Sequence, residues 1–170
     1  MRKRLSTTRQ VLRVRCTPQR TRSITRMPQK YDTMIQQTSI TLTAKRRGVH
    51  LITQEIARQL PALPRTGLLN LFVQHTSCAL SINENADACV RSDMEKILNN
   101  LVKENEPYYD HTLEGEDDMP AHAKSTLCGV SINIPITNSR LNMGTWQGIW
   151  LCEFRNYGGP RKIIATIIGE

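Results

Sequence analysis

The 170-residue sequence lacks a membrane-length apolar run, a secretory leader and a Cys-x-x-Cys pair. No apolar run approaches the ~20 residues that a helix needs to cross a bilayer, and the N-terminus has no continuous apolar segment of the secretory kind. The five cysteines are an odd number, which argues against a disulfide framework, and their spacing argues against a zinc knuckle. We therefore expect reduced, mostly buried thiols in a protein that is neither secreted nor embedded in a membrane.

Acidic residues are missing from the first 30 positions, which hold ten Lys and Arg side chains. The rest of the chain holds 13 basic and 15 acidic groups, a net charge of −2, which argues against nucleic-acid binding by the folded part. An Arg-rich, acid-poor N-terminus that contains Ser and Thr is typical of a mitochondrial or plastid transit peptide. A disordered basic tail, or translation from Met27, explains the same composition. We expect one domain over residues 34–170 and a cytoplasmic or mitochondrial location.

Short β-branched or alternating runs recur along residues 34–170. The runs expected to form strands are 34–43, 68–73, 78–83, 130–136, 149–154 and 162–168. The segments expected to form helices are 53–60, the stretch after the capping sequence 83–87, and 118 to about 127. Pro135 indicates an edge strand or a strand end. Six or seven strands and three helices without regular βαβ alternation predict an α+β fold, with helices laid on an antiparallel or mixed sheet.

The segment 111–122 holds two of the four histidines, four carboxylates and a glycine. It has too few apolar side chains for a core element and many groups that bind metals, move protons or hold polar ligands. His75 follows an apolar strand, where a side chain is rigidly held yet open to solvent. Three histidines near carboxylates suit a divalent ion such as zinc. Because the spacing matches no established metal pattern, histidines bonded to neighbouring backbone remain the alternative.

Other polar residues have competing explanations. Asp118 is expected to cap a helix, although the N–H groups at that helix start are also a natural seat for phosphate or another anion. Ser77 lies beside a histidine, but adjacent residues on an extended chain face opposite ways, and no nucleophile elbow surrounds it. Trp146 and Gln147, in a glycine-flanked turn, either line a pocket or pack against the core. Glu153 is costly to bury unpaired, so we expect it to meet a cation, a metal or a histidine.

The order of the motifs resembles a known family. The motifs are Gln-His-Thr-Ser-Cys-Ala-Leu-Ser-Ile-Asn-Glu-Asn-Ala-Asp at 74–87, Tyr-Asp-His at 109–111, Asp-Asp-Met-Pro-Ala-His-Ala-Lys-Ser at 117–125, Gly-Thr-Trp-Gln-Gly-Ile-Trp-Leu-Cys-Glu at 144–153, and Arg161. They are similar to the YjbQ-like family over about residues 34–170. The sequence departs from the family at Cys78, where a small residue such as alanine is usual, and at Asn138-Ser139, where a glycine is common.

The resemblance implies an α+β, sandwich-like fold that assembles as a homotrimer. It also implies a polar site built from His75, His111 and His122, which metal ions or anions can occupy. Family members are often labelled secondary thiamine-phosphate synthases, an activity that joins a hydroxymethylpyrimidine diphosphate to a thiazole phosphate. The partners expected on this basis are further copies of the chain and a small phosphorylated molecule or anion.

Two hypotheses of different classes follow. In the first, a metal held by the three histidines grips a diphosphate, Lys124 or Arg161 neutralises further charge, and Asp117 or Glu153 positions the metal or a proton. In the second, the same residues form a non-catalytic metal- or anion-binding site. The catalytic candidates are His75, His111, His122, Asp117 and Glu153. The substrate-binding candidates are Ser77, Asp118, Lys124, Trp146, Gln147 and Arg161.

Overall fold

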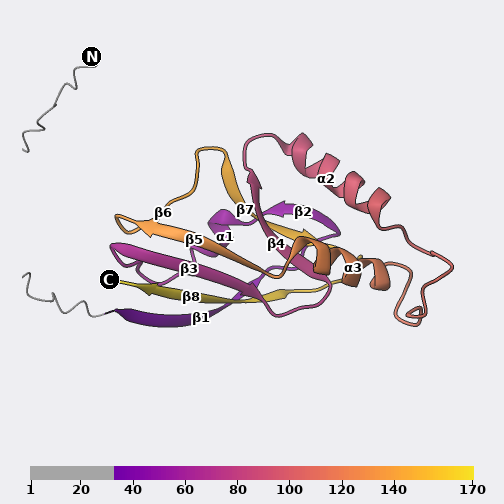
Figure 1. Ribbon diagram of the computed structural model, residues 1–170, viewed down its shortest axis with the longest axis horizontal. Helices are drawn as coiled ribbons and strands as arrows, with labels where there is room; N and C mark the ends of the chain where they lie inside the picture. Colours follow the sequence, from indigo (N-terminus) through magenta and orange to yellow (C-terminus); the bar gives the residue numbers. More distant parts are fainter. Residues whose placement is uncertain (1–32) are drawn as a thin grey trace, which may run out of the picture. The chain divides into compact units, whose positions relative to one another are not determined.

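The computed structural model describes residues 33–170, so the predictions for the basic N-terminal segment lie outside the described residues. Within this range the chain forms eight strands and three helices (Figure 1). The strands are β1 (Met34–Leu42), β2 (Gly48–Leu51), β3 (Thr66–Val73), β4 (Cys78–Glu84), β5 (Ser131–Thr137), β6 (Arg140–Leu141), β7 (Gln147–Glu153) and β8 (Arg161–Gly169). The helices are α1 (Thr53–Ala57), α2 (Ala88–Leu101) and α3 (Asp118–Cys128). None of these helices is long and apolar enough to span a bilayer.

The described strands make two antiparallel sheets. One has five strands in the order β1-β8-β3-β5-β6, and the other has three in the order β2-β7-β4. Strand β8 lies between β1 and β3 in the larger sheet and pairs with β1 over its whole length, from Gly169 opposite Met34 to Arg161 opposite Leu42. The predicted α+β class is confirmed, with antiparallel pairing throughout both sheets.

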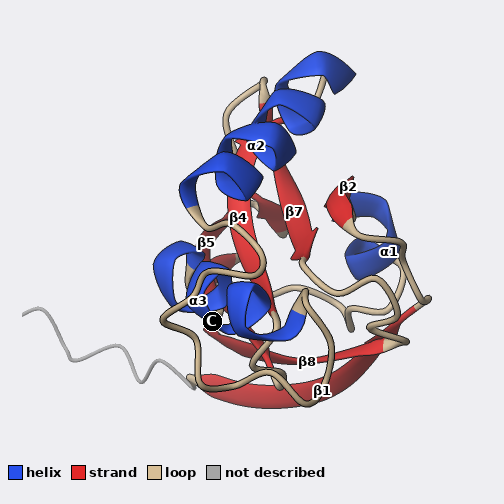
Figure 2. Ribbon diagram, turned by 90° about the vertical axis from the view of Figure 1, so that its right-hand side faces the viewer, coloured by secondary structure: helices blue, strands red, loops and turns tan. Residues whose placement is uncertain are grey.

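The main core lies between the two sheets, and alternation along β4 and β7 divides the smaller sheet between two cores. Cys78 and Leu80 face the main core, where they meet buried residues of β1, β3, β5 and β8. Ala79 and Cys152 face the other way and pack against α2 and α3. Figure 2 shows α2 on the side of the three-stranded sheet away from β1 and β8, and the strand whose backbone lies nearest to it is β2. The result is three layers, which are the five-stranded sheet, the three-stranded sheet and the helices.

Two strands were not predicted, so the expected count of six or seven strands is too low. Strand β2 has four residues, from Gly48 to Leu51, and β6 has two. Neither is long enough to show an alternating pattern, and each is defined by pairing with another strand. Pro135 lies in β5, which is not an edge strand because β6 lies outside it. The two-residue β6 pairs with Ile136 and Thr137 and not with Pro135, so the missing N–H breaks no ladder on that side.

The helix predictions were correct in position and less so in detail. Helix α1 ends at Ala57, and Thr53 does not cap it, because its hydroxyl accepts a hydrogen bond from Ile149 N instead. Asp87 caps α2 as the sequence predicted, by accepting from Cys89 N at 2.7 Å.

The apolar residues Val90, Met94, Ile97 and Leu101 of α2 recur every three or four positions, a periodicity that predicts one apolar face. Within it Leu98 alone is buried, whereas Ile97 and Leu101 are 56% and 67% exposed. The apolar face that the periodicity predicted is therefore largely uncovered within a single chain.

Candidate functional site

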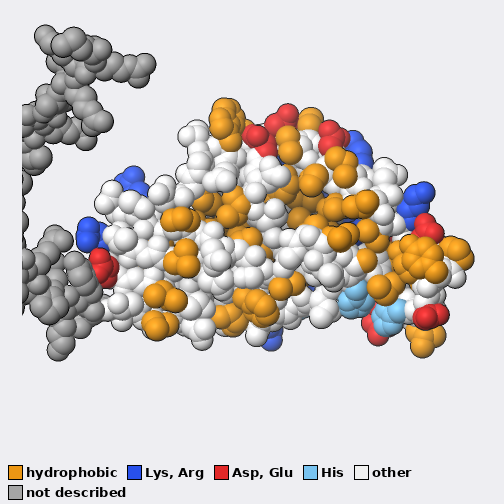
Figure 3. All heavy atoms as spheres, viewed as in Figure 1, with side chains coloured by type: hydrophobic (Ala, Val, Ile, Leu, Met, Phe, Trp, Pro, Cys, Tyr) orange, Lys and Arg blue, Asp and Glu red, His pale blue; other side chains and the backbone are white. Residues whose placement is uncertain are grey.

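A carboxylate and two histidines meet at the start of α3. The loop between α2 and α3 supplies His111, and Asp118 and His122 lie one turn apart on α3. Asp118 Oδ2 lies 2.6 Å from His111 Nε2 and 3.4 Å from His122 Nε2. The three residues each offer a ligand atom, and these atoms all lie within 4.8 Å of one another, close enough to share one metal ion. Figure 3 shows histidine and acidic side chains gathered at this end of the described domain. We call these three residues the ligand cluster.

Helix α3 is fixed firmly enough to hold this geometry. Ala121 is fully buried against the three-stranded sheet, and the Ser125 hydroxyl donates to Cys78 O at 2.8 Å within the core. Asp118 itself is 1% exposed, whereas His111 and His122 are partly open to solvent. The cluster therefore combines a buried carboxylate with two imidazoles that solvent can reach.

The orientation of the His122 ring is set by the backbone of another segment. Its Nδ1 lies 3.2 Å from Thr76 O, a carbonyl that can only accept, so Nδ1 donates to it. Nε2 faces the Asp118 carboxylate at 3.4 Å. Two acceptors in this arrangement repel each other unless a proton or a cation lies between them. A histidine oriented by a backbone carbonyl through its other nitrogen is typical of metal ligands.

Arg155, in the turn after β7, balances the charge at the start of α3. Its Nε donates to Asp117 Oδ2 at 3.1 Å, and its Nη1 forms an ion pair with Asp118 Oδ1. Burial alone would raise the pKa of Asp117, but a hydrogen bond from Asn156 N and the charge of Arg155 outweigh it, so this pKa is lowered. Asp117 is therefore an ionised structural partner of Arg155 in this chain.

Asp118 was expected to cap α3, and this expectation is wrong. It is the first residue of the helix, Asp117 occupies the cap position, and neither makes a side-chain capping bond. The Asp118 carboxylate turns toward the histidines instead. The sequence signal was ambiguous because one residue type serves both purposes.

His75 lies close by but outside the ligand cluster. Its Nε2 accepts a hydrogen bond from Lys162 N at 2.8 Å, and Arg161 Nη1 lies 3.3 Å from its Nδ1. Because Nε2 accepts from Lys162 N, the proton of the neutral ring is on Nδ1, and a second proton on Nε2 would break that hydrogen bond. Burial and the charge of Arg161 lower the pKa of His75. Its Nε2 is therefore hydrogen-bonded to the backbone, which is the alternative that the sequence left open.

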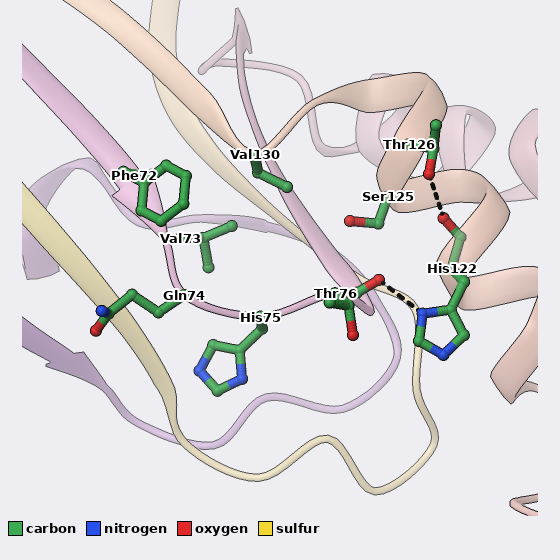
Figure 4. Close-up of a pocket in the computed structure, with 9 residues that line it drawn as sticks. All are labelled: Phe72, Val73, Gln74, His75, Thr76, His122, Ser125, Thr126 and Val130. Carbon is green, nitrogen blue, oxygen red and sulfur yellow. Dashed lines mark hydrogen bonds between the residues drawn. The ribbon is translucent and has the colours of Figure 1, made fainter.

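His75 and His122 nevertheless share a cavity of about 470 Å³. One part of its wall is apolar, from Phe72, Val73 and Val130, and the rest is polar. The polar lining residues are Gln74, His75, Thr76, His122, Ser125 and Thr126. Figure 4 shows the His75 and His122 side chains on either side of Thr76, with the His122 ring reaching the Thr76 carbonyl. A second cavity of about 300 Å³ adjoins His111 on the α2–α3 loop.

Glu153 meets a cation, which is one of the partners the sequence predicted. It forms a buried two-point ion pair with Arg161, whose Nε donates to Oε2 at 2.6 Å. Arg161 Nη2 also donates to Ser77 Oγ at 3.3 Å. All three side chains of this group are buried, and none of them lines the cavity as a catalytic group would: Ser77, Glu153 and Arg161. Arg161 lies against His75, so the group holds His75 in place from within the core.

The remaining candidates lie elsewhere. Lys124 is buried on another face of α3 and donates to Asn99 Oδ1 at 2.6 Å, and burial lowers its pKa to about 8. Trp146 is 65% exposed in the turn before β7, and Gln147 Oε1 accepts from Gly144 N in the same turn. The structure thus brings together His111, His122 and Asp118, with His75 adjacent, and separates them from these three residues.

Two contributors were missed by reasoning from the sequence, the Arg155 side chain and the Thr76 carbonyl. Arg155 belongs to a short turn segment with no periodic or motif signal, and a backbone carbonyl has no residue-type signature. Only the tertiary pairing that brings β4, β7 and α3 together reveals either one.

Comparison with known proteins agrees with this fold. The family model described as "UPF0047 protein YjbQ-like" matches residues 38–170. The UPF0047 protein YjbQ of Salmonella typhimurium is 54% identical over 136 residues, which cover 79% of this chain and 98% of that protein. These names state no activity.

Solved structures share the architecture. A conserved hypothetical protein from Thermus thermophilus is 33% identical, with a TM-score of 0.66 over 75% of this chain and 97% of that one. A protein of unknown function from Sulfolobus solfataricus is 23% identical, with a TM-score of 0.69 over 81% of this chain and 99% of that one. The second likeness concerns the fold alone.

Proposed function

The chain belongs to the UPF0047 YjbQ-like family, and from that premise we propose that it binds a divalent metal ion through His111, Asp118 and His122. The ion and the adjoining cavity together hold a small phosphate- or diphosphate-containing molecule. The reaction proposed for the site is a transfer of the secondary thiamine-phosphate synthase kind, which joins a hydroxymethylpyrimidine diphosphate to a thiazole phosphate.

The observation that carries the proposal is that His122 Nε2 faces a buried carboxylate while its Nδ1 is held by the Thr76 carbonyl. A cation between them satisfies both acceptors, and His111 Nε2 completes a set of two imidazoles and one carboxylate. That donor set suits zinc or ferrous iron, whereas magnesium and calcium prefer oxygen ligands. The residues present therefore fit the ion that the sequence predicted, with Asp118 in the ligand position that His75 was expected to fill.

The cavity beside the cluster supports a ligand with one charged end. Its nine described lining residues include no Lys or Arg, so a phosphate group there needs the ion for charge balance. A bound metal supplies a Lewis acid that polarises phosphoryl oxygens. Phe72, Val73 and Val130 offer an apolar wall for the uncharged part of the ligand, and the neutral His75 orients it without adding charge.

Metal analysis and genetic complementation test the two halves of the proposal. His111→Ala and His122→Ala are expected to lose bound metal, while His50→Ala, on β2 away from the cluster, keeps it. The wild-type gene is expected to restore growth of a thiamine auxotroph and the His122→Ala gene to fail. If metal binding is lost but growth survives, the site is not catalytic for this reaction, and the non-catalytic binding protein becomes the better description.

We also propose that the chain assembles as a homotrimer, as the family resemblance implies. The largely uncovered apolar face of α2 supports self-association, because Ile97 and Leu101 are exposed within one chain. Light scattering after gel filtration tests this proposal. A trimer for wild type and smaller species for Ile97→Asp with Leu101→Asp is the expected result, and a monomeric wild-type protein would refute it.

A further inference from the structure

Arg155 fixes the two carboxylates at the start of α3 to one point of the fold. Its Nε donates to Asp117 Oδ2 at 3.1 Å, its Nη2 donates to Glu114 O at 2.8 Å, and its Nη1 pairs with Asp118 Oδ1. All three guanidinium nitrogens are therefore engaged by residues of a single short stretch. A guanidinium held at three points keeps its orientation when one of the three contacts is weakened.

The two oxygens of Asp118 consequently have different surroundings. Oδ1 is paired with the Arg155 guanidinium by charge and makes no hydrogen bond, whereas Oδ2 faces His111 and His122. A carboxylate can bind a metal through one oxygen or through both. Because the guanidinium covers Oδ1, Oδ2 alone is presented to an ion in the ligand cluster.

Arg155 is itself anchored in the core. Its backbone N–H donates to Glu153 Oε1 at 3.0 Å, and Glu153 forms the buried ion pair with Arg161. The side chain of Arg155 is 21% exposed, and it lies between this buried pair and the cluster. Its position is thus set by a buried ion pair of the core and not by the ion.

We propose that Arg155 determines the metal preference of the site by restricting Asp118 to a single ligand oxygen. This inference rests on the proposed metal site. With Asp118 limited in this way, the protein supplies three donors, two nitrogens and one oxygen, which is the number found in four-coordinate catalytic zinc sites. Mg²⁺, Ca²⁺ and Mn²⁺ favour six or more oxygen-rich ligands, so a second carboxylate oxygen moves the donor set toward their preference. Arg155 acts through Asp118 and is therefore a positioning residue.

The test uses purified full-length protein loaded with Co²⁺, whose visible absorption is intense in four-coordinate and weak in six-coordinate sites. Arg155→Met frees Oδ1, so its Co²⁺ spectrum is expected to weaken toward the six-coordinate form. Its Zn²⁺ affinity is expected to fall about 10- to 100-fold, as is usual when a group that orients a ligand is lost, while its Mn²⁺ affinity is retained or rises. Arg155→Lys keeps a cation at Oδ1 and is expected to restore the wild-type spectrum.

Two further variants separate this role from general disorder of the loop. Arg140→Met removes an exposed arginine of β6 and is expected to match wild type. Asp117→Asn loosens the second contact of Arg155 and leaves its pair with Asp118, so it too is expected to keep the wild-type spectrum. Should Arg155→Met fail to fold by circular dichroism, Arg155→Gln takes its place with the same expectation.

The outcomes distinguish the inference from its premise. Wild-type protein that binds none of these metals overturns the metal site and the inference with it. Wild-type protein that binds Zn²⁺, with an Arg155→Met variant that keeps both the spectrum and the Zn²⁺-to-Mn²⁺ preference, overturns the inference alone. A spectral change in Asp117→Asn as large as that in Arg155→Met also overturns it, because loop order would then be the cause.

Discussion

His122 Nε2 faces Asp118 Oδ2 at 3.4 Å while the other ring nitrogen of His122 is bound to the Thr76 carbonyl. This arrangement favours a cation, and metal should therefore stabilise the fold. A ligand present at 100 times its dissociation constant stabilises the folded state by about 2.7 kcal/mol. We expect saturating Zn²⁺ to raise the melting temperature of wild type and a chelator to reverse the rise, as measured by calorimetry.

The same titration on variants assigns the effect to the cluster. His111→Ala, His122→Ala and Asp118→Asn are expected to lose most of the Zn²⁺-dependent stabilisation, and His50→Ala to retain it. An equal rise in all four variants would place the stabilising ion elsewhere.

The buried ion pair of Glu153 and Arg161, next to His75, should contribute strongly to the free energy of unfolding. Removing one partner of a buried ion pair leaves an uncompensated charge and typically costs about 3–5 kcal/mol. Arg161→Met and Glu153→Gln are each expected to destabilise the protein by about this much in urea unfolding. The double variant should be less destabilised than the sum of the two single variants, because no unpaired charge remains.

Lys45 and Glu55 provide the matched surface pair, since both side chains are 23% exposed. Breaking that pair is expected to cost about 1 kcal/mol or less. If Arg161→Met lowered the free energy of unfolding no more than Lys45→Met does, the buried pair would not be a main source of stability next to His75.

Site residues whose positions depend on local periodicity could be predicted from the sequence, whereas those whose roles depend on long-range contacts could not. The strand that delivers His75 and the helix that carries His122 follow from local periodicity, and both lie where the sequence predicted. Two of the three predicted ligands meet in the structure because they flank the start of one helix. The role of Asp118 could not be separated from capping, because both use a carboxylate at a helix start.

Long-range contacts account for what the sequence could not predict. The engagement of His75 by Lys162 and Arg161 depends on the start of β8 lying beside the end of β3. Lys124 belongs to the same motif as His122 but faces Asn99 of α2, since residues two apart on a helix point in different directions. Family resemblance gives the set of residues, whereas the direction of each side chain comes from packing.

Acid should weaken the fold through His75. Its folded-state pKa lies below the ordinary value of 6.5, chiefly because of burial and then because of the Arg161 charge. As the pH falls through 6.5, the unfolded chain therefore takes up a proton that the folded chain resists, and the free energy of unfolding declines. The contribution is fully present above pH 6.5 and is lost as the pH falls toward the folded-state pKa.

Denaturant unfolding between about pH 7.5 and pH 5, in the presence of a chelator, measures this slope. His75→Gln has no titrating ring, and it is expected to show a shallower pH dependence than wild type. His50→Gln is the control, with the wild-type slope expected. A His75→Gln slope equal to that of wild type would mean that protonation of His75 is not linked to folding.

Lys124 should affect alkaline stability and not ligand binding. It is 1% exposed, and burial lowers its pKa from 10.5 to about 8. Between these values the unfolded chain holds a proton that the folded chain has released, so the free energy of unfolding rises with pH over this window. Lys124→Met removes this contribution, and its unfolding free energy is expected to gain less between about pH 8 and pH 10 than that of wild type. Lys96→Met, at a 69% exposed side chain, is the matched control.

The affinity for Zn²⁺ should be unchanged in Lys124→Met, because Lys124 points to Asn99 and not to the ligand cluster. A marked loss of Zn²⁺ binding in a variant that still folds would mean that Lys124 belongs to the binding site.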